Sequence, residues 1–201
     1  MSLREAGAGA VTGLTAVQGV VDHARVRRGE TVLVFGATGA VGTLAVQFAA
    51  SRGARVIATA TGKKARDLVR RLGAKATIDG RDRDAADKLA VAAPDGVDVV
   101  LAFAGGRELE RLLDLVPRGG RVVYPNGVDP EPQKRPDVRV KGYDATTGAD
   151  KFSQLARAAE RARLRVPIAA TFPVAHAADA HRRLDDHVLG RVAIAVRRQP
   201  R

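Results

Sequence analysis

The chain has 201 residues, of which 45% are hydrophobic and 28% charged, a balance typical of a globular protein. It contains no cysteine, which excludes disulfide bonds, thiolate-bound zinc and a cysteine nucleophile. The 34 basic and 22 acidic residues give a formal net charge of +12, which suits a polyanionic partner, but two Tyr, five Phe and no Trp leave few side chains that could stack on bases.

No apolar run approaches the ~20 residues that a membrane-spanning helix needs. The segment Met1–Ala10 also lacks the apolar stretch of a secretory signal. We therefore expect a cytoplasmic protein with no membrane partner.

Short β-branched runs alternate with longer helical patterns, an order typical of a parallel sheet covered by helices on both faces. An introductory helix is expected first, over Thr12–Ala24, because its apolar residues recur at helical spacing. Strands are expected at Thr31–Phe35, Arg55–Thr59, Ala76–Ile78, Val97–Phe103, Arg121–Tyr124 and Val138–Val140. Helices are expected at Val41–Ala50, Lys63–Leu72, Asp84–Val91, Glu108–Leu115 and Ala149–Arg163, and Pro125–Pro136 is expected as an irregular loop. These elements predict an α/β fold with a doubly wound parallel sheet (Rossmann fold), six strands in the order 3-2-1-4-5-6.

A further strand, helix and strand follow the predicted sheet. The strands are expected at Ile168–Phe172 and Arg191–Val196, and the helix is expected at Ala175–Asp185. The basic residues Arg197–Arg201 are expected to fray. We therefore divide the chain into a Rossmann domain with its introductory helix, residues 1–166, and a C-terminal segment, residues 167–201.

The strongest functional signal is the run Gly36-Ala37-Thr38-Gly39-Ala40-Val41-Gly42, which follows a buried strand and opens a helix. Gly36 permits the tight turn, and Gly39 lacks a Cβ, so that a pyrophosphate could approach N–H groups at the positive end of the helix. Gly42 allows that helix to lie close to the strand. The pattern predicts dinucleotide binding, and its alternative is a βα turn that merely needs glycines.

The end of the second strand indicates which dinucleotide is preferred. An NAD site usually has an acidic residue about 20 residues past the glycines, to accept from the ribose 2′-hydroxyl. Here Thr59, Thr61, Lys63 and Lys64 occupy that place, and no acid occurs before Asp67. Hydroxyl and ammonium groups suit a 2′-phosphate, so NADPH is favoured over NADH. The alternative is that the two lysines are only the solvated first turn of a helix.

Several motifs together resemble the nucleotide-binding half of the medium-chain dehydrogenase/reductase superfamily. They are Gly13-Leu14-Thr15-Ala16, the run from Gly29 to Val34 that leads into the glycine-rich turn, Leu72-Gly73-Ala74, and the endings Thr171-Phe172-Pro173-Val174, Ala178-Asp179-Ala180-His181 and Gly190-Arg191-Val192-Ala193-Ile194. The resemblance covers about Val11 to Val196 and is greatest for the zinc-independent, quinone oxidoreductase-like branch.

The resemblance implies an NADPH site at the ends of the strands. The implied contacts are Gly39, Ala40 and Val41 with the pyrophosphate, Thr59, Thr61 and either Lys63 or Lys64 with the 2′-phosphate, Phe103-Ala104-Gly105 and Asn126-Gly127 beside the nicotinamide and its ribose, and Thr15 with the carboxamide. Two have plain alternatives, since Thr15 could face only its own helix turn and Asn126 could serve only the turn after Pro125. The catalytic group stays unknown, and no metal is implied.

The main departure from the resemblance concerns the substrate domain. In the family this domain precedes the introductory helix, whereas the present sequence does not contain it. We expect that this chain is a fragment or that another polypeptide supplies that domain. The C-terminal segment, which belongs in the family to the substrate domain, would then have no sheet to join and would expose an apolar or partner-binding surface. The free edge of the sixth strand, near Val138–Tyr143, favours a homodimer.

Two rival chemistries lack the residues that they need. Short-chain reductases share the Gly-Ala-Thr-Gly start but need a lysine four residues after a tyrosine, and Tyr124 and Tyr143 are followed there by Val128 and Thr147. His176 and His181 are five residues apart, so they cannot share a helix face as zinc ligands do.

Three functions stay open at this stage. The first is an oxidoreductase that passes hydride from NADPH to a small-molecule quinone or activated enone. The second is an isolated nucleotide-binding or protein-interaction module without turnover. Nucleic-acid binding, the third, is disfavoured because the arginines are scattered over nearly every helix, with one stripe at Arg157, Arg161 and Arg165, and we interpret them as solvated surface.

Overall fold

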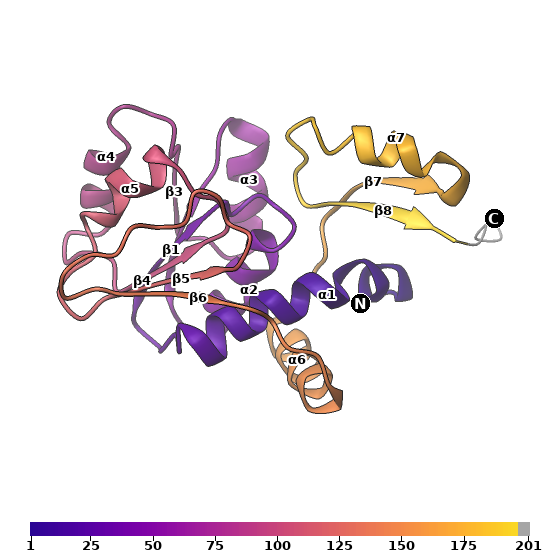
Figure 1. The fold of residues 1–201 in the computed structure, drawn as a ribbon, viewed down its shortest axis with the longest axis horizontal. Coiled ribbons are helices and arrows are strands. Elements are labelled where there is room, and N and C mark those ends of the chain that lie inside the picture. Colours follow the sequence, from indigo (N-terminus) through magenta and orange to yellow (C-terminus); the bar gives the residue numbers. More distant parts are fainter. Residues whose placement is uncertain (197–201) are drawn as a thin grey trace.

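Six parallel strands form the central sheet of the structure, a computed structural model that describes residues 1–196 (Figure 1). In sheet order they are β3 (Ala76–Ile78), β2 (Arg55–Thr59), β1 (Thr31–Phe35), β4 (Val99–Ala102), β5 (Arg121–Pro125) and β6 (Arg139–Tyr143), and every neighbouring pair is parallel. The order 3-2-1-4-5-6 confirms the predicted doubly wound fold, in which the strand order reverses between β1 and β4. The predicted fraying of residues 197–201 lies outside the described residues.

Helices cover both faces of the sheet and bury its centre. One face packs against α1 (Leu3–Gln18), α2 (Gly42–Ser51), α3 (Lys63–Arg71) and α6 (Ala149–Ala162), and the other packs against α4 (Ala85–Ala92) and α5 (Arg107–Leu113). Successive strand residues face opposite sides, so Val34 and Leu101 enter the first core while Leu33 and Val100 enter the second. Burial on both sides explains the uniformly apolar sequences of β1 and β4.

The introductory helix is longer at its start than predicted. α1 begins at Leu3 rather than at Thr12 because Ser2 and Glu5 form a capping box. The Glu5 N–H donates to the Ser2 Oγ at 3.2 Å, and the Ser2 N–H donates to the Glu5 carboxylate at 2.9 Å. Neither this helix nor any other over residues 1–196 has the length and hydropathy to cross a membrane.

The end of the introductory helix also departs from a regular α-helix. After Gln18 the chain continues as a π-helix, η1 (Gly19–His23). A Cβ on Gly19 would lie 2.3 Å from the Oη of Tyr143, so only glycine lets this turn pass the tyrosine. The His23 ring stacks on the Tyr143 ring with 4.5 Å between centroids. A wide turn of this kind often marks a functional part of a helix.

The C-terminal segment forms a second, two-stranded sheet. β7 (Ile168–Pro173) and β8 (Arg191–Ala195) pair in parallel, and a 3₁₀ turn, η2 (Val174–His176), with α7 (Ala177–Arg182) connects them. The expectation that these strands would have no sheet to join is therefore wrong, because each strand satisfies backbone groups of the other. Figure 1 shows this unit beside the N-terminal part of α1. The Arg191 Nη1 donates a hydrogen bond to the Thr12 Oγ1 of this helix at 2.6 Å.

Candidate functional site

The glycine-rich turn connects β1 to α2 and requires glycine at two positions. Gly36 has φ +75°, in the left-handed region that favours glycine. A Cβ on Gly42 would lie 2.2 Å from the Gly36 carbonyl oxygen, so the first turn of α2 packs directly on the exit of β1. A Cβ on Gly39 would meet only that oxygen, at 3.5 Å, which is an ordinary contact. The turn therefore needs Gly36 and Gly42 for its shape, whereas Gly39 borders open space.

Backbone N–H groups at the start of α2 are free to meet a ligand. The Gly39 N–H donates to the Gly36 carbonyl at 3.2 Å, and the Thr43 N–H donates to the Gly39 carbonyl at 3.0 Å. No protein acceptor within residues 1–196 receives the N–H groups of residues 40–42. The positive end of the helix dipole lies at the same place. These donors and the missing Cβ of Gly39 fit a diphosphate.

Thr59, at the end of β2, braces the glycine-rich turn. Its Oγ1 accepts from the Gly36 N–H at 3.0 Å and donates to the Val34 carbonyl at 3.4 Å. The residue is only 8% exposed. Its hydroxyl is therefore already engaged inside the sheet, next to the turn rather than in open solvent.

A carboxylate that the sequence analysis did not consider lies beside Thr61. The Thr61 Oγ1 donates to the Asp79 Oδ1 at 2.8 Å, and the Arg81 N–H donates to the same oxygen at 3.1 Å. β3 is parallel to β2, so the end of β3 brings Asp79 to the place where an acid is missing from the sequence after β2. The sequence signal that could have identified Asp79 is its position just after β3, the strand beside β2, rather than any residue that follows β2.

The structure distinguishes the two lysines that the sequence left equivalent. The Lys63 Nζ lies 2.8 Å from the Asp67 Oδ2, and this hydrogen bond lowers the pKa of Asp67. Lys64 has no ion pair among the described residues and borders a cavity of about 380 Å³. The rest of that cavity is lined by Asp67, Leu68, Arg71, Pro167, Ile168 and Leu189.

The stretch Phe103-Ala104-Gly105 crosses the carboxyl edge of the sheet beside the glycine-rich turn. The Phe103 N–H donates to the last carbonyl of β1 at 2.9 Å, and a Cβ on Gly36 would lie 3.2 Å from the Phe103 carbonyl carbon. A Cβ on Gly105 would lie 1.9 Å from the carbonyl oxygen of Pro130. Gly105 therefore permits the loop after β5 to approach this edge.

Asn126 and Gly127 turn the chain at the end of β5. The Asn126 N–H donates to the Tyr143 carbonyl at 2.8 Å, and its Nδ2 donates to the Asp144 Oδ2 at 2.7 Å. A Cβ on Gly142 would lie 2.8 Å from the Asn126 Oδ1, so β6 passes closely beside the amide. Gly127 has φ +93°. Asn126 is thus fixed against the end of β6 by its backbone and its side chain.

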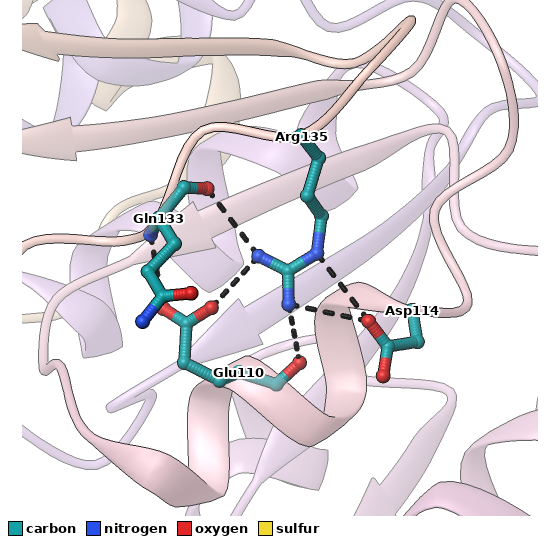
Figure 2. A network of polar contacts seen from close by, with 4 residues as sticks. All are labelled: Glu110, Asp114, Gln133 and Arg135. Atoms are coloured by element: carbon teal, nitrogen blue, oxygen red, sulfur yellow. Dashed lines mark hydrogen bonds and ion pairs between the residues drawn. The ribbon is translucent and has the colours of Figure 1, made fainter.

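Four polar residues hold the loop after β5 to α5, as Figure 2 shows. The Arg135 guanidinium lies 2.7 Å from the Glu110 Oε2 and 3.2 Å from the Asp114 Oδ1. The Gln133 N–H donates to the Glu110 Oε1 at 3.0 Å. The half-buried Arg135–Glu110 pair stabilises the loop more than a fully exposed pair would, because solvent screens it less. The network fixes residues 133–135 against α5.

Thr15 lies on α1, where its hydroxyl faces its own helix. The Thr15 Oγ1 donates to the Val11 carbonyl at 3.3 Å, as in the plain alternative for this residue. The Thr15 carbonyl accepts from the Tyr143 Oη at 2.8 Å. The Gln18 Nε2 also donates to the Thr146 carbonyl at 2.9 Å, and the Gln18 Oε1 accepts from the Thr146 N–H and Oγ1 at 3.0 and 3.1 Å, so four hydrogen bonds connect α1 to the end of β6 and the residues just after it.

The C-terminal segment reaches the glycine-rich turn, which the sequence analysis did not predict. The Gly190 N–H donates to the Thr38 carbonyl at 2.8 Å. Gly190 has φ +92°, and a Cβ there would lie 2.3 Å from the Pro167 carbonyl oxygen. The Arg81 Nη2 lies 3.2 Å from the His187 Nε2. The loop before β8 therefore borders the glycine-rich turn and the chain just after β3.

The described residues contain no group of three His, Cys, Asp or Glu side chains that could hold a metal ion. The two histidines considered as ligands lie on the exposed surface. The His176 Nδ1 lies 2.9 Å from the Asp179 Oδ2, and this hydrogen bond lowers the pKa of Asp179. His181 lies on α7, and its side chain has no hydrogen-bond partner in the described part of the chain.

Sequence comparison identifies relatives among oxidoreductases. Residues 40–157 match the family model described as zinc-binding dehydrogenase. The quinone oxidoreductase of Mus musculus is 28% identical over 194 residues, covering 90% of this chain and 59% of that enzyme. The NADPH-dependent curcumin reductase of Escherichia coli is 34% identical over 111 residues, covering 55% of this chain and 32% of that enzyme.

Solved structures of similar proteins have the same fold. The CurK enoyl reductase matches with a TM-score of 0.82 and 28% identity, over 97% of this chain and 64% of that one. An NAD-dependent alcohol dehydrogenase matches with a TM-score of 0.88 and 30% identity, over 98% of this chain and 60% of that one. The chain thus spans about three fifths of the length of these relatives.

Proposed function

Because the chain belongs to the zinc-binding dehydrogenase family and is a quinone oxidoreductase-like nucleotide-binding half of the medium-chain dehydrogenase/reductase superfamily, we propose that it binds NADPH for hydride transfer. The observation that carries this proposal is the start of α2. There the N–H groups of residues 40–42 have no acceptor within residues 1–196, Gly39 has no Cβ, and the positive end of the helix dipole lies at the same place. Together these features suit a pyrophosphate.

The preference for NADPH over NADH rests on Lys64. Lys63 is paired with Asp67, so Lys64 is the ammonium that is free to receive the adenosine 2′-phosphate. Asp79 would repel a phosphate at close range, but its Oδ1 already accepts from Thr61 and from the Arg81 backbone. The name of the E. coli relative, an NADPH-dependent reductase, agrees with this preference.

The nicotinamide end of the coenzyme would lie across the carboxyl edges of β4 and β5. Phe103-Ala104-Gly105 and Asn126-Gly127 border that edge, and the Arg135 network keeps the intervening loop in place. Thr15 would reach the carboxamide after its hydroxyl rotates away from Val11. NADPH supplies the hydride, and these residues hold its ring in one orientation.

We infer that the acceptor is a quinone or an activated enone and that the reaction needs no zinc. Relatives named as quinone oxidoreductase and enoyl reductase support the acceptor class. The lack of cysteine and of a three-residue ligand group in residues 1–196 supports zinc independence for this half.

A substrate domain and a second copy of the chain are the proposed partners. Apolar side chains stand exposed on α1 and on β8, namely Leu3, Val11 and Ile194 at 94%, 74% and 47% exposure. Exposed apolar side chains suit a domain interface where they gather on one face. Among residues 1–196, β6 pairs only with β5, so its second edge is available for a homodimer.

The alternative function is coenzyme binding without turnover. Titration of NADPH monitored by nicotinamide fluorescence measures binding, and NADPH oxidation with a quinone acceptor measures turnover. Micromolar binding with oxidation supports the oxidoreductase. Binding without oxidation supports the alternative, and no binding of either nicotinamide coenzyme at millimolar concentration overturns both.

A further inference from the structure

A cavity of about 490 Å³ lies where three helices of one face end. Its lining residues come from the ends of α2, α3 and α6 and from the chain just beyond α6: Gln47, Ala50, Ser51, Arg71, Leu72, Arg161, Ala162, Arg163 and Arg165. α2 starts at the glycine-rich turn and rises about 1.5 Å per residue, so the cavity lies roughly 15 Å from the candidate dinucleotide site. The glycine-rich turn contributes no residue to this cavity, and Arg71 is the one residue that it shares with the cavity beside Lys64.

The lining of this cavity is strongly and uniformly positive. Four of its nine residues are arginines and none is acidic. All four arginines are exposed, and no carboxylate among residues 1–196 forms an ion pair with any of them. The charge of Arg71 contributes to the lowered pKa of Asp67, whereas Arg161, Arg163 and Arg165 have no carboxylate partner among the described residues.

A buried glutamine fixes the backbone that carries two of these arginines. The Gln47 Nε2 donates to the Arg165 carbonyl at 2.8 Å, and the Gln47 Oε1 accepts from the Arg165 N–H at 2.8 Å. Leu164 and Val166 are 7% and 5% exposed and enter the core. Arg163 and Arg165 alternate with them and project outward. The cavity thus has a rigid base, Gln47, which is only 6% exposed.

The positive charge of the four arginines exceeds the negative partial charge at the three helix C-termini. Three helix C-termini carry together about 1.5 negative elementary charges, whereas four guanidinium groups carry four positive ones. The surplus favours an anion with several charges. One guanidinium group can donate two parallel hydrogen bonds to two oxygens of a phosphate. Two adjacent phosphates could therefore be bound by several arginines at once. The earlier interpretation of Arg157, Arg161 and Arg165 as one helical stripe does not apply, because α6 ends at Ala162.

We propose that this cavity binds a small molecule with two or more linked phosphate groups. A concave site of this volume, built by three helices over a buried glutamine, suits a small ligand better than an extended polyanion. The proposal does not rest on the proposed coenzyme function, because the cavity lies at the ends of α2 and α3 opposite to the glycine-rich turn and Lys64, although its Arg71 also lines the Lys64 cavity.

Inorganic pyrophosphate titrated into the ¹⁵N-labelled chain at about 0.15 M salt tests the site, because this ionic strength screens exposed charges. We expect the amide resonances of Arg161, Arg163, Arg165 and Arg71 to shift together and to saturate. Shifts confined to the glycine-rich turn, or spread evenly over the basic surface, would overturn the proposal. So would the absence of saturation up to millimolar pyrophosphate.

Two double variants with the same change of net charge separate a site from general attraction. Arg161→Gln with Arg163→Gln should weaken pyrophosphate binding at least about tenfold, whereas Arg83→Gln with Arg157→Gln should change it less than about twofold. Arg71→Gln, on another helix, should weaken binding independently of any change at the end of α6. Circular dichroism confirms that each variant is folded. Equal losses in both double variants would contradict the proposal.

Discussion

The Tyr143 Oη donates a hydrogen bond to the Thr15 carbonyl oxygen at 2.8 Å, and the Tyr143 carbonyl accepts from the Asn126 N–H at 2.8 Å. One residue at the end of β6 therefore connects two elements of the candidate nicotinamide site, α1 and the turn after β5. Burial raises the pKa of the Tyr143 phenol, so it stays protonated and continues to donate well above neutral pH.

Tyr143→Phe should loosen this connection while keeping the ring that packs on His23. We expect a loss of about 1 kcal/mol in the free energy of unfolding, since one hydrogen bond is removed and the Thr15 carbonyl still accepts from the Gly19 N–H. NADPH affinity should also fall, because Thr15 moves more freely. Urea denaturation and NADPH titration measure the two effects. Tyr124→Phe, which removes a bond to Glu131 instead, is the control and should leave NADPH affinity unchanged.

Substitution by alanine should change the stability of the protein very differently at two glycines of the turn. Gly42→Ala places a Cβ 2.2 Å from the Gly36 carbonyl oxygen, so we expect a destabilisation of about 3 kcal/mol or more. Gly39→Ala meets only an ordinary contact at 3.5 Å, so its stability should change by less than about 1 kcal/mol.

Coenzyme binding provides the second measurement for this pair of variants. Gly39→Ala should abolish detectable NADPH binding although the protein is folded, because its methyl group occupies the approach of the diphosphate. Thermal denaturation reports stability, and fluorescence titration reports binding. A stable Gly39→Ala protein that binds NADPH normally would show that the turn is only a structural βα connection.

The centre of the sheet could be predicted from the sequence because β1, β2 and β4 are buried on both faces. Thr31–Phe35, Arg55–Thr59 and Ala76–Ile78 were bounded correctly, since apolar β-branched runs between turn residues allow little else. The start of α1 was missed because Leu3 and Val11 are exposed and give no apolar periodicity. The Ser2–Glu5 capping box was the available signal.

The parts of the site that the sequence did not reveal come from segments far apart in the chain. Asp79 reaches Thr61 because β3 lies beside β2, and Gly190 reaches Thr38 through the return of the C-terminal segment. Neither contact could be predicted from a periodicity or from the spacing of a motif in the sequence. Residues that follow a strand directly, such as Gly36, could be assigned to the turn because chain connectivity alone fixes their place.

Lys64→Gln should change coenzyme preference. We expect NADPH affinity to fall about tenfold, equivalent to ~1.4 kcal/mol and close to one charge-assisted hydrogen bond, while NADH affinity stays the same. Lys63→Gln is the matched control, and it should have less effect because its ammonium already pairs with Asp67. Parallel titrations with NADPH and NADH measure the ratio. Equal losses for both coenzymes in Lys64→Gln would rule out a contact with the 2′-phosphate.

Acidification should release the first turns of α1. The hydrogen bond from the Ser2 N–H is the largest of the effects that lower the pKa of Glu5 below its ordinary value of 4.5. A carboxylate whose folded-state pKa is lowered contributes stability above its unfolded-state pKa and loses that contribution as the pH falls through the folded-state value. Amide hydrogen exchange of residues 3–8 should therefore accelerate below about pH 4.5, relative to the rest of α1. In Glu5→Gln the amide keeps the cap without titrating, so an equally strong acceleration in that variant would contradict the role of the Glu5 carboxylate.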